Sequence, residues 1–354
     1  MSLPDPKFWS GKRVLLTGHT GFKGSWLTLW LHHLGATVAG LSLPPITDPS
    51  LFESARVAEV CCLSRMGDIR DRAATAAVIR DFRPEIVLHL AAQPLVRASY
   101  REPVETFATN IQGTIHVLDA LRGLAEVQVA VMITTDKVYR NREWERPYRE
   151  EDTLGGADPY SASKAACELV IDAYRDSFLR AQGVRLASAR SGNVIGGGDW
   201  SEDRLIPDAV RAWQQGQVLE IRRPGAVRPW QHVLDPLAGY LLLAESLWHR
   251  KAAEEAYNFG PLQDDAASVR TVIEIARKGV GGAAVHYHEA VQGPHEAGLL
   301  LLESAKARSR LGYRSRWGLA EGVRRTLDWY QAQAVGDDAR RLCEQDIREY
   351  TALP

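Results

Sequence analysis

The sequence has 354 residues, which is enough for one large α/β domain and a smaller second domain. Hydrophobic residues make up 45% and charged residues 25%, as is usual for a globular protein. The formal net charge of −1 argues against a protein that coats nucleic acid or a membrane surface, so any basic site must be local. The four cysteines lack the spacing of a metal site or a disulfide framework, which indicates reduced thiols.

Targeting and membrane-spanning segments are not expected in this chain. Residues 1–10 contain no apolar stretch of signal-peptide length, and the longest apolar run, residues 240–244, is far too short to span a bilayer. The sequence therefore predicts a cytoplasmic protein with neither nucleic acid nor a membrane as partner.

Short apolar strands alternate with amphipathic helices in the first half of the chain. The predicted strands are residues 13–17, 37–41, 85–90, 129–134 and 185–189, and the predicted helices are residues 23–33, 73–82, 104–124 and 161–179. This alternation predicts an α/β fold with a Rossmann-like, doubly wound parallel sheet and helices on both faces. In such sheets ligands bind beyond the carboxyl ends of the strands, so residues that directly follow a strand are the first site candidates.

A glycine-rich loop joins the first strand to the first long helix. Its glycines allow a tight turn, a close approach of backbone amides to a pyrophosphate and close packing of helix on strand. The loop therefore predicts a dinucleotide site. The predicted contacts are Gly18, His19, Thr20, Gly21, Phe22, Lys23 and Gly24.

The acidic residue that usually bonds the adenosine ribose is missing after the second strand. Residues 41–44 read LSLP, with neither a carboxylate nor an arginine that would hold a 2′-phosphate, so the sequence favours NAD over NADP only weakly. Asp68 and Ile69 follow the predicted third strand, where Asp68 can bond the adenine edge. Asp68 can equally act as the N-cap of a helix over residues 70–80.

Tyr160 and Lys164 lie four residues apart at the start of the helix that follows the fifth strand. This spacing places both side chains on one face of the helix. A nearby ammonium lowers the pKa of a phenol, so we expect Tyr160 to act as a base that removes a hydroxyl proton while hydride leaves the same carbon.

Further motifs follow the fourth and fifth strands, namely Leu90-Ala91-Ala92-Gln93, Thr109-Asn110 and the run TTDKVY at residues 134–139. With the loop and the tyrosine–lysine pair, they resemble the extended short-chain dehydrogenase/reductase family of nucleotide-sugar enzymes over residues 1 to about 330. The resemblance implies NAD as cofactor. It implies cofactor contacts from Ala91, Ala92, Gln93 and Asn110, and a hydrogen bond from Thr135 to the sugar near its C4 oxygen.

Asp136 and Lys137 follow Thr135 at the end of the fifth strand and point to dehydration. Oxidation or 4-epimerisation needs only the tyrosine, the lysine and a hydroxyl residue. Dehydration also needs a base for the C5 proton and an acid for the departing C6 hydroxyl. The family's 4,6-dehydratases generally carry Thr-Asp-Glu here, with Asp as acid and Glu as base. Lys137 replaces that Glu, so a base role requires that its pKa be depressed. The alternative is a surface turn that carries an Asp136–Lys137 ion pair.

The Thr-Asp-Lys form and the loop GHTGFKGSWL are similar to the CDP-glucose 4,6-dehydratase branch of the family. The resemblance implies a hydro-lyase that converts CDP-D-glucose to CDP-4-dehydro-6-deoxy-D-glucose for a dideoxysugar of a bacterial surface polysaccharide. It also implies that His19 lies near the cofactor phosphates, although a neutral, solvated histidine fits the sequence equally well.

Glycines and prolines break the chain into shorter pieces after about residue 191, which predicts a smaller C-terminal α/β substrate domain. By resemblance, Asn193 contacts the sugar diphosphate and Asp235 fixes a loop. Arg204 and Arg228 are the candidate diphosphate ligands, because guanidinium groups pair bidentately with phosphate oxygens. A structural ion pair is the alternative for each arginine.

The predicted division has an NAD-binding domain over residues 1–190, with a returning segment at 228–255. Residues 191–227 and 256–354 form the predicted nucleotide-sugar-binding domain. In the family, the helices over residues 104–124 and 161–179 pair with their copies, which implies a homodimer and leaves a homotetramer open.

No metal site is predicted. His286, His288 and His295 lack a carboxylate or cysteine set at ligand spacing, and the expected chemistry needs no metal.

Three alternatives stand beside dehydration of CDP-glucose: a dTDP- or GDP-hexose 4,6-dehydratase, a nucleotide-sugar 4-epimerase and a non-catalytic NAD-binding scaffold. The Asp136–Lys137 pair disfavours the epimerase, and Lys137 disfavours the usual dTDP form. The intact set of Tyr160, Lys164 and Asp136 disfavours the scaffold.

Overall fold

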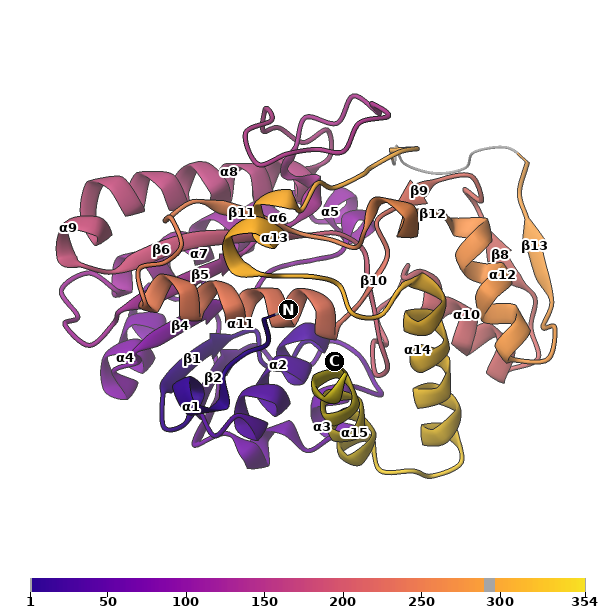
Figure 1. The fold of residues 1–354 in the computed structure, drawn as a ribbon, viewed down its shortest axis with the longest axis horizontal. Helices are drawn as coiled ribbons and strands as arrows, with labels where there is room; N and C mark the ends of the chain where they lie inside the picture. Colours follow the sequence, from indigo (N-terminus) through magenta and orange to yellow (C-terminus); the bar gives the residue numbers. More distant parts are fainter. Residues whose placement is uncertain (1, 290–296, 354) are drawn as a thin grey trace.

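A seven-stranded parallel sheet forms the centre of the computed structural model, which describes residues 2–289 and 297–353 (Figure 1). The strands are β1 (Arg13–Thr17), β2 (Thr37–Ser42), β3 (Leu63–Met66), β4 (Ile86–His89), β5 (Val129–Ile133), β6 (Arg185–Ser191) and β11 (Ala256–Phe259). Their order is β11-β6-β5-β4-β1-β2-β3, so the winding reverses between β1 and β4. The predicted Rossmann-like, doubly wound parallel sheet is confirmed.

Helices cover both faces of the sheet because alternate strand residues point to opposite sides. Val14 and Leu16 of β1 belong to the core beneath one set of helices, whereas Leu15 belongs to the core on the other face. The first face is covered by α2 (Phe22–His33) and α11 (Leu234–Trp248), and the second by α4 (Arg72–Phe82), α7 (Gly113–Ala120) and α8 (Pro159–Tyr174).

Other helical segments join and flank these elements. They are α1 (Pro6–Trp9), α3 (Leu51–Ser54), α5 (Val96–Arg101), α6 (Pro103–Phe107), α9 (Arg180–Gln182), α10 (Leu205–Gln214), α12 (Val269–Gly279), α13 (Ala305–Leu311), α14 (Leu319–Ala334) and α15 (Ala339–Ala352), with 3₁₀ turns η1 (Val57–Val60), η3 (Asp136–Val138) and η5 (Gln263–Asp265). Within the described residues, no helix combines the length and apolar character that a membrane span requires.

The two long helices predicted over residues 104–124 and 161–179 each contain a π-helical turn. The first divides into α6, the π turn η2 (Ala108–Gln112) and α7, and the second into α8 and the π turn η4 (Arg175–Leu179). A π turn accommodates one extra residue and often marks a functional segment. In η2 it holds Asn110, which bonds residues on two other elements.

Three short strand pairs and two helices form a smaller lobe, at the right of Figure 1. The pairs are β7 (Val194–Ile195) with β10 (Gln231–His232), β9 (Val227–Arg228) with β12 (Ala267–Ser268), and β8 (Leu219–Ile221) with β13 (Val285–Tyr287). Helices α10 and α12 bury Ala209 and Ile273 against Leu219 and Ile221 of β8.

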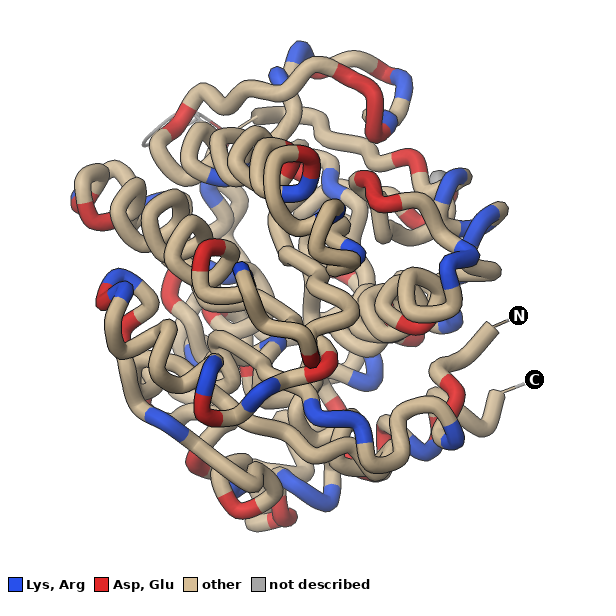
Figure 2. The backbone as a smooth tube through the Cα atoms, turned by 90° about the vertical axis from the view of Figure 1, so that its left-hand side faces the viewer, with Lys and Arg blue, Asp and Glu red and all other residues tan. Residues whose placement is uncertain are grey.

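The chain crosses between the lobes more often than a simple division suggests. Strand β11 lies in the central sheet, so the return of the chain to that sheet extends beyond residue 255. The other predicted domain bounds remain a prediction. The C-terminal helix α15 also reaches the larger lobe, where the Tyr350 ring meets that of Trp30 at 5.6 Å. Figure 2 shows basic and acidic residues interspersed along the tube, with both chain ends on one side.

Candidate active site

Two adjoining cavities lie beyond the carboxyl ends of the strands. The smaller, of ≈ 300 Å³, is bounded by the glycine-rich loop, and the larger, of ≈ 680 Å³, lies against the smaller lobe. Lys137, Asn193 and Arg204 line both cavities. A ligand that filled both would therefore pass these three side chains at the junction.

The glycine-rich loop has the geometry of a phosphate cradle. Gly18 has φ +80°, and a Cβ there would lie 2.7 Å from the amide nitrogen of Ala91. A Cβ on Gly24 would lie 2.0 Å from the Gly18 carbonyl oxygen. No side chain of the described chain caps the amides at the start of α2, where Gly21 is the N-cap residue. These amides are available to an anion at the helix N-terminus.

Most predicted cofactor contacts line the smaller cavity. They are Gly18, Thr20, Gly21, Phe22, Lys23, Gly24, Asp68, Ile69, Ala91, Ala92, Tyr160 and Lys164. Residues 42–47, which follow β2 and contain no acidic residue that would bond the ribose, line this cavity. The hydroxyl oxygens of Ser42 and Thr20 lie 2.7 Å apart and share a hydrogen bond. The cavity thus fits a dinucleotide held mainly by backbone amides and hydroxyl groups.

The side chain of His19 is buried rather than solvated, and its predicted place near the cofactor phosphates remains a prediction. Its side chain is fully buried, its Nε2 lies 2.8 Å from Ser64 Oγ, and its ring packs against Gly40 and Phe52. The described lining of the smaller cavity omits His19. Burial lowers the pKa of His19 to about 4, so the predicted neutral form holds, but the solvated environment is wrong.

The N-cap alternative for Asp68 is also wrong. Helix α4 begins at Arg72, and Asp71 is the residue that accepts a hydrogen bond from the Ala74 amide. Asp68 instead accepts hydrogen bonds from the amide and guanidinium of Arg70 while it lines the cavity. These hydrogen bonds lower the pKa of Asp68, so it faces the cavity as a carboxylate.

Asn110 and Gln93 stabilise the site through hydrogen bonds. Asn110 Oδ1 accepts from the Gln93 amide at 2.8 Å, and its Nδ2 donates to Ser163 Oγ at 2.9 Å. Neither residue is in the described lining of the two cavities. They tie the segment after β4 to α8, and so fix the backbone of Ala91 and the helix that carries Tyr160.

Tyr160 and Lys164 both reach the smaller cavity from the first turns of α8, as predicted. Lys164 is not among the main influences on the pKa of the phenol. Burial raises the pKa of Tyr160 to about 12, and the groups that oppose this are Thr135, through a hydrogen bond, and Arg204, through its charge. Lys164 Nζ donates instead to the Ile133 carbonyl oxygen at 3.2 Å.

Asp136 is the most deeply buried acid that lines the smaller cavity, with 2% of its surface exposed. Its Oδ1 accepts from Thr135 Oγ1 at 3.1 Å, whereas its Oδ2 has no hydrogen-bond partner among the described residues. Burial raises the pKa of Asp136, against the opposing charge of Lys137. The surface-turn alternative is therefore wrong, and the raised pKa shifts Asp136 toward the protonated form that an acid requires.

Lys137 is half-buried and borders both cavities from η3. After burial, the charge of Lys137 has the largest effect on the pKa of Asp136, which it lowers. Its role as the C5 base remains a prediction.

Lys23 reaches further into the site than a phosphate contact requires. Its ammonium donates to Ser191 Oγ at 3.0 Å and to Tyr240 Oη at 2.6 Å. Burial, and then the charges of Lys164 and Arg204, lower the pKa of Lys23 to about 7. Sequence reasoning missed both hydroxyl partners. The position of Ser191 at the end of β6 was a usable signal, whereas Tyr240 lies inside an apolar helix that gave none.

The predicted diphosphate ligands surround the larger cavity. Asn193 follows β6, and Arg204 stands at the N-terminus of α10, where it donates to the Pro94 carbonyl oxygen at 3.2 Å. Arg228 is 7% exposed and donates to the carbonyl oxygens of Val227 and Ala297, so hydrogen bonds to backbone fix its guanidinium. Its charge opposes the rise in the pKa of Asp136.

Asp235 lies outside the two cavities, and its carboxyl bonds the C-terminal segment rather than the loop over residues 228–233 that the resemblance implied. The carboxylate accepts from the Arg316 amide at 2.7 Å, Tyr350 Oη at 2.8 Å and Ser315 Oγ at 2.9 Å.

A carboxylate does lie beside His286 and His288, so the expectation that they lack one is wrong. Glu220 of β8 lies beside His286 of β13 and His288, which directly follows β13. His295 lies outside the described residues.

Several named 4,6-dehydratases are similar to this chain in sequence or in structure. A CDP-glucose 4,6-dehydratase from Salmonella typhimurium is 47% identical over 352 residues, 98% of either chain. A dTDP-glucose 4,6-dehydratase from Streptomyces antibioticus is 30% identical over 328 residues, 90% of this chain and 92% of that protein. The crystal structure of DesIV, a dTDP-glucose 4,6-dehydratase from Streptomyces venezuelae with NAD bound, superposes with a TM-score of 0.78 at 27% identity. It covers 91% of this chain and 98% of that one.

The sequence model of a family described as "GDP-mannose 4,6 dehydratase" matches residues 15–326. This match spans the glycine-rich loop, the Tyr160–Lys164 pair and most of the smaller lobe. The expected resemblance to nucleotide-sugar enzymes is confirmed, and the chain belongs to the GDP-mannose 4,6 dehydratase family.

Proposed function

We propose that this chain catalyses the NAD-dependent 4,6-dehydration of CDP-D-glucose to CDP-4-dehydro-6-deoxy-D-glucose, a hydro-lyase reaction. The observation that carries the proposal is a buried carboxyl at Asp136, whose pKa is raised by burial, in the same cavity as Tyr160 and Lys164. The 47% identity to a CDP-glucose 4,6-dehydratase over 98% of both chains supports this nucleotide sugar.

The smaller cavity fits NAD because glycines keep the cradle open and unpaired helix amides face it. Amides of the loop bind the pyrophosphate, and Asp68 with Ile69 borders the adenosine end. When bound, NAD supplies the acceptor and donor of the hydride. Lys23 and Lys164 contribute positive charge at the opposite end.

Tyr160 is the group that takes the proton from the C4 hydroxyl. Burial raises its pKa to about 12 because it disfavours the phenolate. Thr135 and Arg204 both lower the pKa of Tyr160, so they favour proton uptake by this residue when the C4 hydroxyl approaches. Thr135 also bonds Asp136 and thereby links base and acid.

Asp136 and Lys137 carry the elimination of water. Asp136 gives its proton to the departing C6 hydroxyl while Lys137 removes the proton from C5. The hydride taken from C4 then goes to C6, and Lys137 returns its proton to C5. The proton that Tyr160 gains at C4 balances the one that Asp136 gives up at C6. A plain 4-epimerase has no use for an acid buried at this position, which favours the dehydratase over that alternative.

Arg204 and Asn193 bind the sugar diphosphate at the junction of the two cavities. Arg204 offers a guanidinium that borders both cavities, with one donor engaged on a carbonyl. Arg228 is held by backbone carbonyls, and its charge acts on the acid beside it.

A turnover screen tests the proposal directly. Purified protein with NAD is incubated separately with CDP-, dTDP-, UDP- and GDP-glucose, and products are measured by mass. We expect loss of one water from CDP-glucose, with slower or no loss from the others. A product of unchanged mass would establish an epimerase, and faster dehydration of another nucleotide sugar would reassign the substrate.

Substitution of Asp136 separates dehydration from oxidation. Asp136→Asn should slow water loss by about 10²- to 10⁴-fold, the usual contribution of a general acid, while Thr135 and Tyr160 remain in place. Tyr160→Phe serves as the matched control, because it should abolish C4 oxidation while NAD binding is kept. Full water loss in Asp136→Asn would remove this residue from the mechanism.

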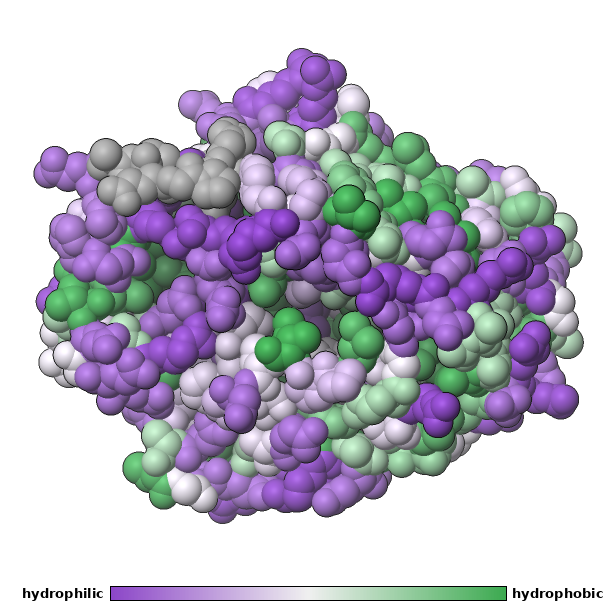
Figure 3. Space-filling view, turned by 180° about the vertical axis from the view of Figure 1, so that it is seen from behind, coloured by the Kyte–Doolittle hydropathy of each residue, from purple (hydrophilic) through white to green (hydrophobic). Residues whose placement is uncertain are grey.

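A homodimer and a cytoplasmic location belong to the same proposal. Exposed apolar side chains occupy neighbouring segments: Val104 (79% exposed) and Phe107 on α6, and Leu169 (64% exposed) on α8. Figure 3 shows hydrophobic residues gathered at the upper right, the side where Figure 1 places α8. Such a patch is typical of a subunit interface. The described cysteines are all free, which fits a reducing compartment.

A further inference from the structure

Two strands of the smaller lobe bring three potential metal ligands together. Strands β8 and β13 pair in parallel, with His286 opposite Glu220. His288 is two residues after His286. Because side chains alternate between the two faces of an extended segment, both histidines point to the same face. Glu220 is 66 residues from His286 in the sequence, and the pairing of the two strands brings it beside the two histidines.

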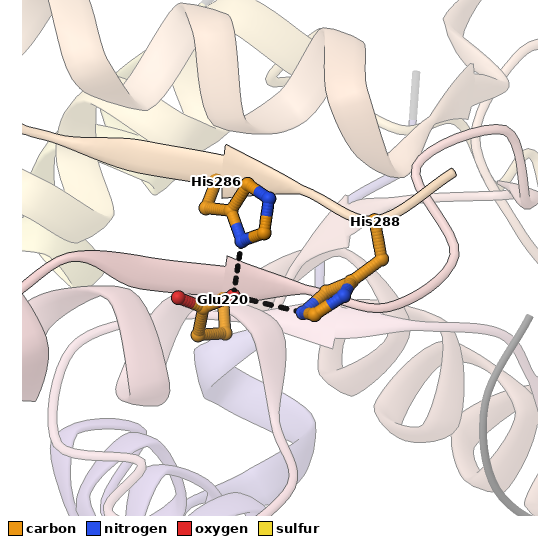
Figure 4. A group of neighbouring side chains, drawn as sticks. All are labelled: Glu220, His286 and His288. Atoms are coloured by element: carbon orange, nitrogen blue, oxygen red, sulfur yellow. Dashed lines mark hydrogen bonds and ion pairs between the residues drawn. The ribbon is translucent and has the colours of Figure 1, made fainter. Parts of the chain in front are cut away.

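The donor atoms converge on one point (Figure 4). His286 Nδ1 lies 2.7 Å and His288 Nε2 2.8 Å from the same carboxylate oxygen of Glu220. All three ligand atoms lie within 4.8 Å of one another. The imidazole rings are tilted by 52° with centroids 4.7 Å apart, so their nitrogens face the carboxylate from two directions.

We propose that Glu220, His286 and His288 form a binding site for zinc or a similar divalent transition-metal ion. Two imidazole nitrogens and one carboxylate oxygen are a ligand set that zinc uses with a fourth, open position for water. Half-exposed side chains give the ion access from solvent, and small outward movements of the donors would accommodate it between them.

The position of this site suggests what a bound ion would do. Glu220 and Ile221 line the larger cavity, whereas β13 lies on the outer side of β8. The strand pair is short, with three residues in each strand. An ion bound by both strands would cross-link them and stiffen this wall of the cavity. The site is separate from Asp136 and Tyr160, so the inference does not depend on the proposed reaction.

Zinc binding to the intact, untagged chain tests the proposal. Protein stripped with a chelator and dialysed is titrated calorimetrically with zinc chloride. We expect one ion per chain for the wild-type protein and at least about a tenfold loss of affinity in H286N/H288N, since even outer-shell changes around a metal cost 10- to 100-fold. The control H32N/H33N removes two exposed histidines at the end of α2 and should bind zinc as the wild-type protein does.

A second variant and a stability measurement guard against misfolding. Glu220→Gln removes the carboxylate charge and should also weaken zinc binding at least about tenfold. Without zinc, the wild-type protein and all variants should unfold at similar temperatures, and zinc should raise the unfolding temperature only where the site is intact. Equal zinc binding by the wild-type protein and H286N/H288N, or no binding by the wild-type protein, would overturn the proposal.

Discussion

Lys23 adds a second buried ammonium to a cleft that already contains Lys164. Two cations in one cavity are costly unless one of them loses its proton or finds an anion. The pKa of Lys23 is about 7, so this side chain can change charge near neutral pH. Its charge also lowers the pKa of Asp136. The glycine-rich loop beside the cofactor site is therefore coupled electrostatically to this acid.

The pH dependence of Lys23→Met tests this connection. Removal of the cation should raise the pKa of Asp136, so the acid would keep its proton to higher pH. We expect the alkaline limb of the kcat/KM profile to move upward by about one unit at saturating NAD. Lys23→Arg retains the charge and should leave the limb near its wild-type position. An unmoved limb in Lys23→Met would show that the two groups are uncoupled.

The sequence predicted which candidate residues line the smaller cavity better than it predicted their electrostatics. Tyr160, Lys164 and Asp136 were identified because each follows a strand or opens a helix at a fixed spacing. The pKa of Tyr160 was predicted in the wrong direction, since burial outweighs nearby charges and burial is not visible in a motif. Glu220 was missed because strand pairing across 66 residues, rather than local spacing, brings it to the histidines.

At the junction of β1 and α2, the fold requires glycine at Gly18 and Gly24 but not at Gly21. At Gly24 a Cβ would meet the Gly18 carbonyl oxygen at 2.0 Å, a backbone atom that cannot move without loss of the turn. At Gly21 the nearest atom would be 3.4 Å away and φ is −77°, which any residue adopts.

Gly24→Ala should therefore destabilise the NAD-free protein by at least about 2 kcal/mol, whereas Gly21→Ala should change the free energy of unfolding by less than about 1 kcal/mol. Chemical denaturation without cofactor measures both. Equal losses for the two variants would mean that the helix can move away from the strand.

Helix α11 is joined to the C-terminal segment through a buried carboxyl. Burial raises the pKa of Asp235 to about 6. Between about pH 4 and 6, the folded protein keeps this proton while the unfolded chain has lost it. Unfolding then releases a proton, so the contribution of Asp235 to stability falls as the pH rises through this window.

Asp235→Asn should remove this pH dependence. Relative to the variant, the wild-type protein should lose on the order of 3 kcal/mol of unfolding free energy between pH 4 and pH 7. Denaturation curves at several pH values measure the difference. A constant difference across the window would show that Asp235 titrates normally.

At the scale of the whole molecule, the exposed apolar side chains of Val104, Phe107 and Leu169 on α6 and α8 mark the predicted subunit interface. Leu169→Glu places a charge on α8 within it, and a dimer should then dissociate to monomers in size-exclusion chromatography with light scattering. Val335→Glu is the matched control, since Val335 is 84% exposed after α14. A monomeric wild-type protein, or a dimeric Leu169→Glu variant, would contradict the interface.

The central sheet was predictable because parallel strands buried on both faces are continuous apolar runs. The predicted strand over residues 13–17 matches β1, and the predicted helix over residues 73–82 differs from α4 by one residue. The π turns were not predictable, since an extra residue in one turn leaves the apolar pattern almost unchanged. The small strand pairs were missed because two or three residues carry no usable periodicity.

The location of β11 limits how substrate preference could be transferred between relatives. Exchange of everything after residue 190 as a single cassette would also replace the outermost strand of the central sheet, together with its contacts to β6. Chimaeras should instead swap short inserts that border the larger cavity, such as residues 193–228, and retain α11 and β11 from the recipient. Such grafts keep the seven-stranded scaffold native while they change the walls around the ligand.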